Sequence, residues 1–295
     1  MTVFASIGFL LGLAVVLASL LALANARLRV EEDPRIDDVE QMLPGNNCGA
    51  CGMPGCRAFA EATVAGSIAP SACTVGPPEM AQEVADYLGI EAGSREPTVA
   101  RLLCAGGRDV AGSIGDYQGH ASCRAVSVTG SSKGCTWGCL GLGDCEVVCT
   151  FDAIVMGPTG LPIVDLDKCT SCGDCVRICP RGLFEIVPVA HHLLVQCKSE
   201  LEGDRALDLC KVACTGCGKC AADAAAGLVS MRKNLPMIDD ERRHLESPTA
   251  TLRCPTAAIR WVEGQQFPEH VAKMRGTEQT APASTTDSAE SKHVV

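Results

Sequence analysis

The chain has 295 residues, of which 20 are cysteines and only 3% are aromatic, so a conventional hydrophobic core is poorly supplied. Its net charge of −10 at pH 7 argues against nucleic-acid binding, which needs a basic surface. A secreted disulfide scaffold or a zinc protein could also use many cysteines. The spacings described below instead follow the geometry of iron–sulfur clusters, so we expect bound metal to supply much of the folding energy.

The first 26 residues carry no charge, and they are almost wholly apolar from Val3 to Ala24. About 22 such residues can cross a hydrocarbon core about 30 Å thick. Arg27 and Arg29 follow at once, which by the positive-inside rule places the rest of the chain in the cytoplasm. A signal peptide cleaved after Ala26 is the alternative, but no basic residue precedes the apolar stretch. We predict a transmembrane anchor at residues 1–26, in the inner (cytoplasmic) membrane.

A cysteine-rich module is expected at residues 27–95. Three of its cysteines lie in one glycine-rich loop, and the fourth returns after a short helix predicted over residues 57–65. Glycines let the backbone of such a loop pass close to a cluster. The module therefore predicts one [4Fe–4S] cluster, with ligands Cys48, Cys51, Cys56 and Cys73.

Two cysteine loops at residues 135–190 predict a ferredoxin-like unit with two [4Fe–4S] clusters. The second loop has the C-x2-C-x2-C-x3-C-P spacing of bacterial ferredoxins, in which the fourth cysteine ligates the other cluster. The first loop departs from this spacing, because Leu142 stands at the usual middle position. The predicted ligands are Cys135, Cys139, Cys145 and Cys179 for one cluster, and Cys149, Cys169, Cys172 and Cys175 for the other.

The first loop is repeated 75 residues later, which indicates a second ferredoxin-like unit at residues 191–265. Ala224 stands where the repeat would place the crossing cysteine, and residues 238–252, just before Cys254-Pro255, contain no cysteine and so no second three-cysteine loop. Both losses concern the same cluster, so one cluster should remain. Its predicted ligands are Cys214, Cys217, Cys220 and Cys254.

Four clusters thus account for sixteen cysteines, and Cys104, Cys123, Cys197 and Cys210 are left over. Four thiols could bind a fifth cluster. The interpretation we favour is that they are buried thiols packing as small hydrophobes, with Cys210 a relic of the repeat. Cys197 lies near the position that corresponds to Cys123 in the repeat.

Short strands are expected at residues 153–156, 161–164, 183–187, 227–231, 236–238 and 258–262. The predicted fold class is therefore α+β: an N-terminal transmembrane helix, a small helical module and tandem ferredoxin-like units. Residues 96–134 are interpreted as a linker or small subdomain. Residues 266–295 are predicted to be a disordered tail, because residues 277–295 are rich in Ser, Thr, Ala and Glu.

The order of these parts resembles the B subunits of Rnf-type ion-translocating oxidoreductase complexes, in the extended form with a second ferredoxin-like unit. The similarity covers about residues 3–262 and rests on the anchor, the Asn47–Arg57 motif, the Gly138–Cys145 motif and the loop ending in Cys179-Pro180. Ala224 and the missing loop before Cys254 are departures from it.

The resemblance implies an electron-relay subunit of a membrane complex that passes electrons between ferredoxin and NAD while moving Na⁺ or H⁺. Its partners would be the other subunits of the complex and a soluble ferredoxin. The sequence has no nucleotide-binding fingerprint or nucleophile–base pair, so the chain would be an enzyme, a translocase, only as part of that complex. The alternatives are a ferredoxin-like subunit of another respiratory or hydrogenase complex and an iron–sulfur redox sensor.

Overall fold

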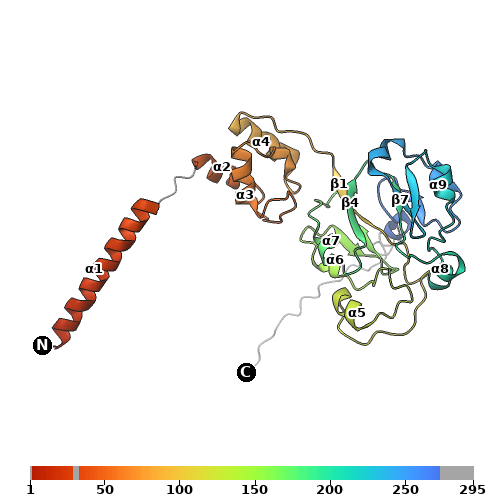
Figure 1. Cartoon of the computed structure of the whole chain (residues 1–295), viewed down its shortest axis with the longest axis horizontal. Helices are drawn as coiled ribbons and strands as arrows, with labels where there is room; N and C mark the ends of the chain where they lie inside the picture. Colours follow the sequence, from red (N-terminus) through yellow and green to blue (C-terminus); the bar gives the residue numbers. More distant parts are fainter. Residues whose placement is uncertain (1, 29–32, 273–295) are drawn as a thin grey trace, which may run out of the picture. The chain divides into compact units, whose positions relative to one another are not determined.

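The structure is a computed structural model that describes residues 2–28 and 33–272 (Figure 1). The chain divides into two compact units. The first is built from residues 1–70 and 78–92, and the second from residues 71–77 and 93–295. Each unit is described by itself.

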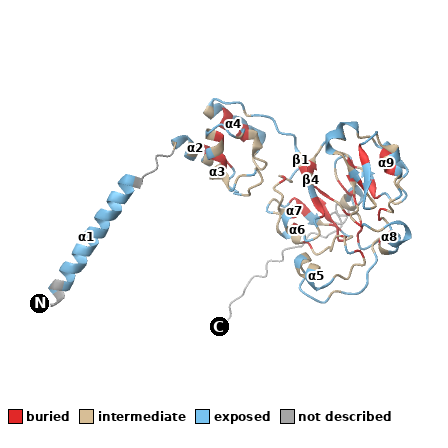
Figure 2. Cartoon of the chain, viewed as in Figure 1, coloured by how far each residue is buried: buried red, intermediate tan, exposed pale blue. Residues whose placement is uncertain are grey.

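The first compact unit contains a long apolar helix and a small helical module. Helix α1 (Thr2–Leu28) includes a 22-residue stretch, Ser6–Arg27, that is long and apolar enough to cross a membrane, and none of it is buried (Figure 2). The module consists of α2 (Pro34–Met42), α3 (Cys56–Val64) and α4 (Pro78–Leu88). Its core is formed by Val39, Phe59, Ala60 and Val84, one apolar face from each helix.

The second compact unit contains two copies of one β-α-β-β-α-β order. The first copy comprises β1 (Thr98–Leu102), α6 (Asp144–Val147), β2 (Ile154–Met156), β3 (Pro162–Val164), α7 (Asp174–Ile178) and β4 (Phe184–Pro188). The second comprises β5 (Leu193–Val195), α9 (Lys219–Asp223), β6 (Val229–Arg232), β7 (Leu235–Ile238), α10 (Thr249–Leu252) and β8 (Ile259–Trp261). Four further short helices lie outside this order: η1 (Pro70–Ala72), α5 (Cys123–Thr129), α8 (Gly203–Leu209) and η2 (Asp240–Leu245).

In each copy the first strand pairs antiparallel with the last, and the middle strands form a hairpin. Leu102 lies opposite Phe184, the first residue of β4, and Val195 lies opposite Ile259, the first residue of β8. Leu102 and Val195 are therefore equivalent positions. The tandem of ferredoxin-like units predicted from the cysteine repeat is confirmed by this matching topology.

The predicted strands agree with β2, β3, β4, β6, β7 and β8 to within two residues at each end, whereas β1 and β5 were not predicted. β1 lies inside residues 96–134, the segment interpreted as a linker or small subdomain, and completes the sheet of the first ferredoxin-like unit. Neither missed strand alternates between buried and exposed side chains: four of the five residues of β1 are buried, and β5 has only three residues, Leu193–Val195. Local alternation alone gives little signal for such strands.

The disordered tail predicted at residues 266–295 begins too early. The side-chain amide of Gln266 accepts a hydrogen bond from the Leu102 backbone nitrogen (3.0 Å) and donates one to the Leu102 carbonyl (2.7 Å). Phe267 is buried in the core of the first ferredoxin-like unit. The compositional bias begins only at residue 277, so it gives no reason to start the tail before Gln266 and Phe267, which contact the first ferredoxin-like unit. Residues 273–295 lie outside the described residues.

Candidate iron–sulfur sites

Sixteen cysteines of the second compact unit line four pockets, four cysteines to each. We name them by their cysteines. Pocket A holds Cys123, Cys139, Cys145 and Cys179; pocket B holds Cys149, Cys169, Cys172 and Cys175; pocket C holds Cys214, Cys217, Cys220 and Cys254; pocket D holds Cys104, Cys135, Cys197 and Cys210.

Within residues 2–28 and 33–272, no three Cys, His, Asp or Glu side chains come close enough to share one metal ion. Four thiolates at about 2.3 Å from one zinc lie within roughly 4 Å of one another. The four cysteine ligands of a [4Fe–4S] cluster each bind a different iron, so their sulfurs lie farther apart than the ligands of one zinc ion. Four-cysteine pockets that are too wide for zinc therefore fit such a cluster.

Pocket A differs from one predicted ligand set, because Cys123 and not Cys135 lines it together with Cys139, Cys145 and Cys179. The Asp144 carboxylate accepts hydrogen bonds from the Ser122 hydroxyl (3.0 Å) and from the backbone nitrogens of Cys123 (2.9 Å) and Arg124 (3.1 Å). It thereby caps α5 and holds Cys123 over the loop that carries Cys145. Burial alone would raise the pKa of Asp144, but these donors lower it overall.

The sequence contained a signal for Cys123 that was not used. Leu142 occupies the middle ligand position of the first loop, so a fourth thiol had to come from elsewhere. Cys123 lies 16 residues before Cys139, at the start of α5. No known ferredoxin spacing marks a cysteine at that distance as a ligand. The loop spacing could therefore show that a ligand was missing without showing which cysteine replaced it.

Pocket B brings together the four cysteines predicted for it. The crossing arrangement is also present, since Cys149 follows the loop of pocket A and Cys179 follows the loop of pocket B. Both crossing sulfurs accept a backbone hydrogen bond at 3.4 Å, Cys149 from Ala153 and Cys179 from Leu183. Such donors stabilise negative charge on a ligand sulfur.

Buried Arg101 on β1 supplies a positive charge near pocket B. Its side chain is 1% exposed, and one nitrogen donates to the Gly264 carbonyl at 2.8 Å. The other two guanidinium nitrogens have no hydrogen-bond partner among the residues that the structure describes. Burial lowers the pKa of Arg101, and the nearby Cys169 thiolate acts in the opposite direction. An unpaired cation at this place fits a site for a negatively charged cluster.

Burial raises the pKa of Cys139 and of Cys175 to about 12. Pockets of the bare protein therefore favour neutral thiols, and iron binding must displace their protons. Cys254 in pocket C differs. Burial alone would raise its pKa, but the backbone nitrogens of Ile259, Thr256 and Ala258 lower it overall.

Pocket C contains the predicted set, including Cys254. The cysteine loop of pocket B has no cysteines at the corresponding positions of the second ferredoxin-like unit. His244, Ser247 and Ala250 stand 75 residues after Cys169, Cys172 and Cys175, and Ala250 is buried beside Leu193.

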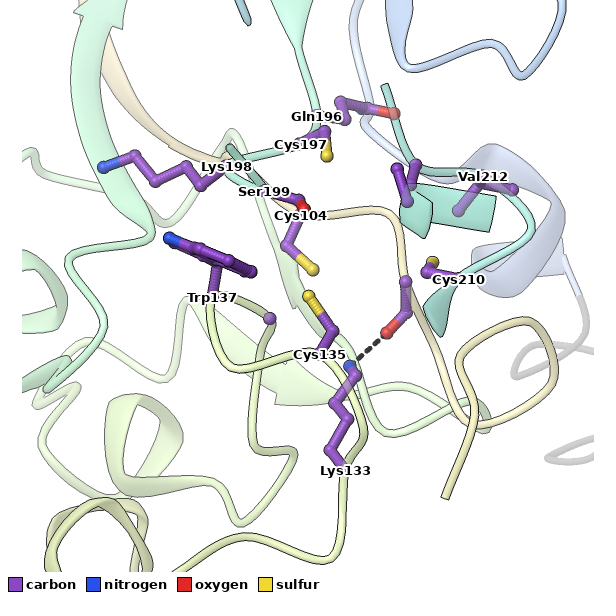
Figure 3. Close-up of a pocket in the computed structure, with 14 residues that line it drawn as sticks. Cys104, Lys133, Cys135, Trp137, Gln196, Cys197, Lys198, Ser199, Cys210 and Val212 are labelled. Carbon is purple, nitrogen blue, oxygen red and sulfur yellow. Dashed lines mark hydrogen bonds between the residues drawn. The ribbon is translucent and has the colours of Figure 1, made fainter. Parts of the chain in front are cut away.

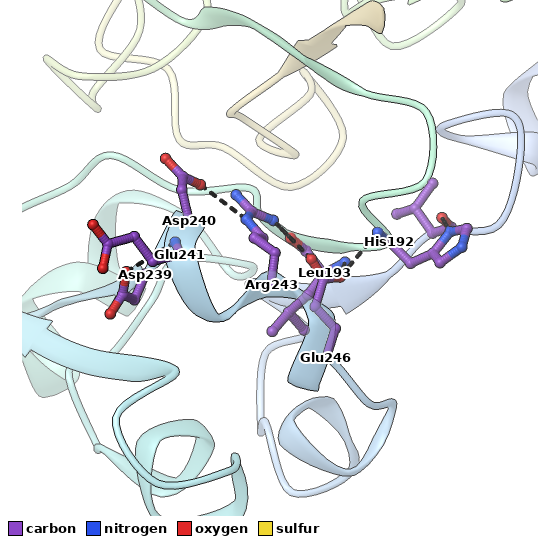
Figure 4. Close-up of polar contacts among 8 residues, drawn as sticks. His192, Leu193, Asp239, Asp240, Glu241, Arg243 and Glu246 are labelled. Atoms are coloured by element: carbon purple, nitrogen blue, oxygen red, sulfur yellow. Dashed lines mark hydrogen bonds and ion pairs between the residues drawn. The ribbon is translucent and has the colours of Figure 1, made fainter. Parts of the chain in front are cut away.

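An ion pair anchors this replaced region to β5 (Figure 4). Glu246 accepts from the backbone nitrogens of His192 (3.0 Å) and Leu193 (2.8 Å), and Arg243 donates to the Leu193 carbonyl (3.1 Å) and to Glu246 (3.3 Å). The exposed fraction is 10% for the Arg243 side chain and 6% for that of Glu246. A buried ion pair with these hydrogen bonds stabilises the region without iron.

In the first compact unit, Cys48, Cys51 and Cys56 lie in the loop that leads into α3. The Asn47 side chain accepts from the Cys56 backbone nitrogen at 2.8 Å, which fixes the end of the loop. Cys73 lies in the segment Ser71–Pro77 of the second compact unit, where its carbonyl accepts from Arg95 at 2.9 Å. That these four cysteines share one cluster stays a prediction.

Pocket D contains Cys135 and three of the four cysteines left without a predicted role. Burial raises the pKa of Cys210, and the thiolates of Cys104, Cys135 and Cys197 raise it further. The structure also replaces the suggested correspondence of Cys197 with Cys123. Cys197 follows Val195 by two residues, as Cys104 follows the equivalent Leu102.

Two family models match the chain, "Putative Fe-S cluster" at residues 43–75 and "4Fe-4S binding domain" at residues 161–184. The first spans Cys48, Cys51, Cys56 and Cys73. The chain is also 38% identical over 255 residues to the B subunit of the ion-translocating oxidoreductase complex of Methanosarcina acetivorans, a match that covers 86% of this chain and 96% of that protein. The chain belongs to the family of these B subunits.

Other members of the family are similarly close. The B subunit of the Na⁺-translocating ferredoxin:NAD⁺ oxidoreductase complex of Acetobacterium woodii is 43% identical over 75% of this chain and 67% of its own length. The proton-translocating counterpart of Clostridium ljungdahlii is 37% identical over 86% of this chain and 88% of its own length. The predicted family is confirmed.

Proposed function

We propose that the chain is a membrane-anchored electron-relay subunit of an ion-translocating complex that exchanges electrons between ferredoxin and NAD. The observation that carries the proposal is the grouping of thiols into four-cysteine pockets with interleaved ligands. Cys149 and Cys179 each leave the loop of one pocket and line the other, so pockets A and B are joined by two short stretches of chain. Neighbouring redox centres held this way suit electron transfer.

Four [4Fe–4S] clusters follow from this proposal. Pockets A, B and C would hold one each, and Cys48, Cys51, Cys56 and Cys73 would hold the fourth. Each cluster takes up one electron at a potential between about −700 and +450 mV. The protein provides the thiolates, excludes water by burial, and directs backbone N–H groups at Cys149 and Cys179. Arg101 adds a buried positive charge beside pocket B.

The names of the relatives support the coupled reaction. The Acetobacterium and Clostridium proteins are named as subunits of complexes that translocate Na⁺ and protons, respectively. We infer that the present chain works in the same type of complex, with ferredoxin as donor or acceptor. α1 would anchor it in the cytoplasmic membrane, and Arg27 would keep the iron–sulfur units on the cytoplasmic side.

The test is electron transfer in membranes that contain the whole complex. Inverted vesicles should reduce NAD⁺ with reduced ferredoxin and take up Na⁺ or H⁺, and Cys175→Ala should abolish both activities. Asp240→Ala, a change at a carboxylate 80% exposed, should leave them intact. If vesicles lacking the chain retain full ferredoxin:NAD⁺ activity, the proposal is wrong. Co-purification with hydrogenase or other respiratory subunits would favour a different complex.

A further inference from the structure

Pocket D lies where the two ferredoxin-like units meet, and each unit supplies two of its cysteines (Figure 3). Cys104 and Cys135 come from the first ferredoxin-like unit, and Cys197 and Cys210 from the second. The backbone ties the two sides together. The Ala105 nitrogen donates to the Gln196 carbonyl at 2.9 Å, and the Lys211 nitrogen donates to the Val110 carbonyl at 3.0 Å.

The four cysteines occupy positions that correspond in the two units. Cys104 and Cys197 each follow the equivalent end of the first strand by two residues. Cys135 and Cys210 are 75 residues apart and each precedes the first cysteine loop. Each ferredoxin-like unit therefore brings the same two positions to pocket D, and the site is a product of the internal duplication. Unrelated thiols packing as hydrophobes would not be expected to show this correspondence.

Hydrogen bonds repeat the correspondence at the sulfur atoms. The Cys139 nitrogen donates to the Cys104 sulfur at 3.4 Å, and the Cys214 nitrogen donates to the Cys197 sulfur at 3.3 Å. These are the distances at which Cys149 and Cys179 receive their donors in pockets B and A. Amide donors aimed at sulfur stabilise thiolates that carry negative charge.

The walls of pocket D leave space and supply positive charge. A Cβ atom added at Gly106 would lie 3.0 Å from the Cys210 sulfur and 3.7 Å from that of Cys104, so glycine lets the backbone approach both sulfurs without crowding. The Lys133 ammonium lines the pocket and donates to the carbonyls of Gly106 and Cys139. The space, including its opening, is about 380 Å³, against about 380, 330 and 320 Å³ in pockets A, B and C.

We propose that Cys104, Cys135, Cys197 and Cys210 bind a fifth [4Fe–4S] cluster at the junction of the two ferredoxin-like units. Buried free thiols and a zinc site are the alternatives. Free thiols would account for the burial, but not for two equivalent pairs of cysteines, each with an amide donor to one sulfur, that converge beside the Lys133 ammonium. A zinc ion needs its ligands within roughly 4 Å of one another, and no three Cys, His, Asp or Glu side chains among the described residues lie that close.

The iron content of the full chain, purified anaerobically in detergent, tests the site. After reconstitution to a constant value, we expect about twenty iron and twenty sulfide per chain, four of each per cluster. Cys210→Ala should remove about four of each, and the double variant Cys104→Ala/Cys210→Ala should remove the same four, because both residues serve one site. Cys217→Ala, the matched control in pocket C, should remove a different four, and combined with Cys210→Ala about eight.

A wild-type value near sixteen iron would overturn the proposal without any variant, as would zinc in place of four of the irons. Spectra of the single variants separate the ligand sets. Cys135→Ala and Cys210→Ala should remove the same electron paramagnetic resonance signal, and Cys123→Ala a different one. If Cys135→Ala instead removes the signal lost in Cys139→Ala, Cys135 belongs to pocket A and the fifth site does not exist.

A cluster in pocket D would connect the two units, a role that rests on the proposed relay function. The amides that bind its ligand sulfurs belong to Cys139 of pocket A and Cys214 of pocket C. Fully reduced protein should therefore show spin–spin broadening of the pocket C signal that disappears in Cys210→Ala. An unchanged line shape would refute the bridging role. Iron content does not depend on ferredoxin:NAD⁺ activity, so failure of the proposed function would leave the site intact.

Discussion

At the scale of single residues, one substitution in a ferredoxin loop explains the rearranged ligands of the first ferredoxin-like unit. Leu142 stands where the second ferredoxin-like unit has Cys217, which lines pocket C. Cys123 supplies the missing thiol from α5, and Asp144 holds that helix in place. Cys135 is then free to line pocket D. Loss of one loop cysteine is thus compensated from outside the loop.

This compensation predicts a rescue. Cys123→Ala should lose about four iron, because pocket A keeps only three thiolates. Adding Leu142→Cys should restore them, since the change completes the loop spacing that Cys214, Cys217 and Cys220 use in the second ferredoxin-like unit. Iron and sulfide analysis and the spectrum of the cluster measure both steps. If Cys123→Ala retains all its iron, Cys123 is not a ligand.

At the scale of elements, the sequence predicted what cysteine spacing and turn residues determine locally. The helix of the first module, the two hairpins and the closing strands β4 and β8 followed from such signals. The grouping of Cys149, Cys169, Cys172 and Cys175 could also be predicted, because one loop fixes three of them. Pocket D could not, since its four cysteines come from four segments, and the two ferredoxin-like units meet there through backbone hydrogen bonds between residues far apart in sequence, such as Ala105 to Gln196 and Lys211 to Val110.

The region that replaces the lost cluster gives a prediction about stability. Glu246→Ala should leave the buried Arg243 with only the exposed Asp240 as an ionic partner, and the backbone nitrogens of His192 and Leu193 without an acceptor, at a cost of about 3 kcal/mol. For a unit of this size the unfolding temperature should fall by roughly 6–12 °C. The unfolding temperature can be measured from the loss of the visible absorbance of the clusters on heating.

Asp240→Ala is the control for that variant, because Asp240 also pairs with Arg243, at 3.0 Å, but is 80% exposed. Its effect should stay below about 1 kcal/mol. Equal effects of the two changes would show that the burial of Glu246 does not matter.

At the scale of the whole molecule, duplication has produced a tandem that shares a site rather than two independent units. In the second ferredoxin-like unit, Ala250 and the Arg243–Glu246 pair lie in the segment that corresponds to the cysteine loop of pocket B, while Cys197 and Cys210 face the first ferredoxin-like unit. These iron–sulfur pockets all lie in the second compact unit, whereas the apolar helix α1 belongs to the first. The helix contributes no cysteine, so its role should be separable from cluster binding.

Removal of residues 2–28 tests this separation. The truncated chain, produced without partner subunits, should move from the membrane fraction to the soluble fraction, because the only candidate span among the described residues is lost. Its iron content should equal that of the full chain, since no thiol is removed. A chain whose α1 residues are shuffled without changing their composition should stay in the membrane, because apolar length and not sequence drives insertion.

Protease added to inverted vesicles should digest the anchored chain, since inversion exposes the cytoplasmic side. A mature N-terminus at Arg27 in cells would instead identify residues 1–26 as a cleaved signal peptide and refute the anchor.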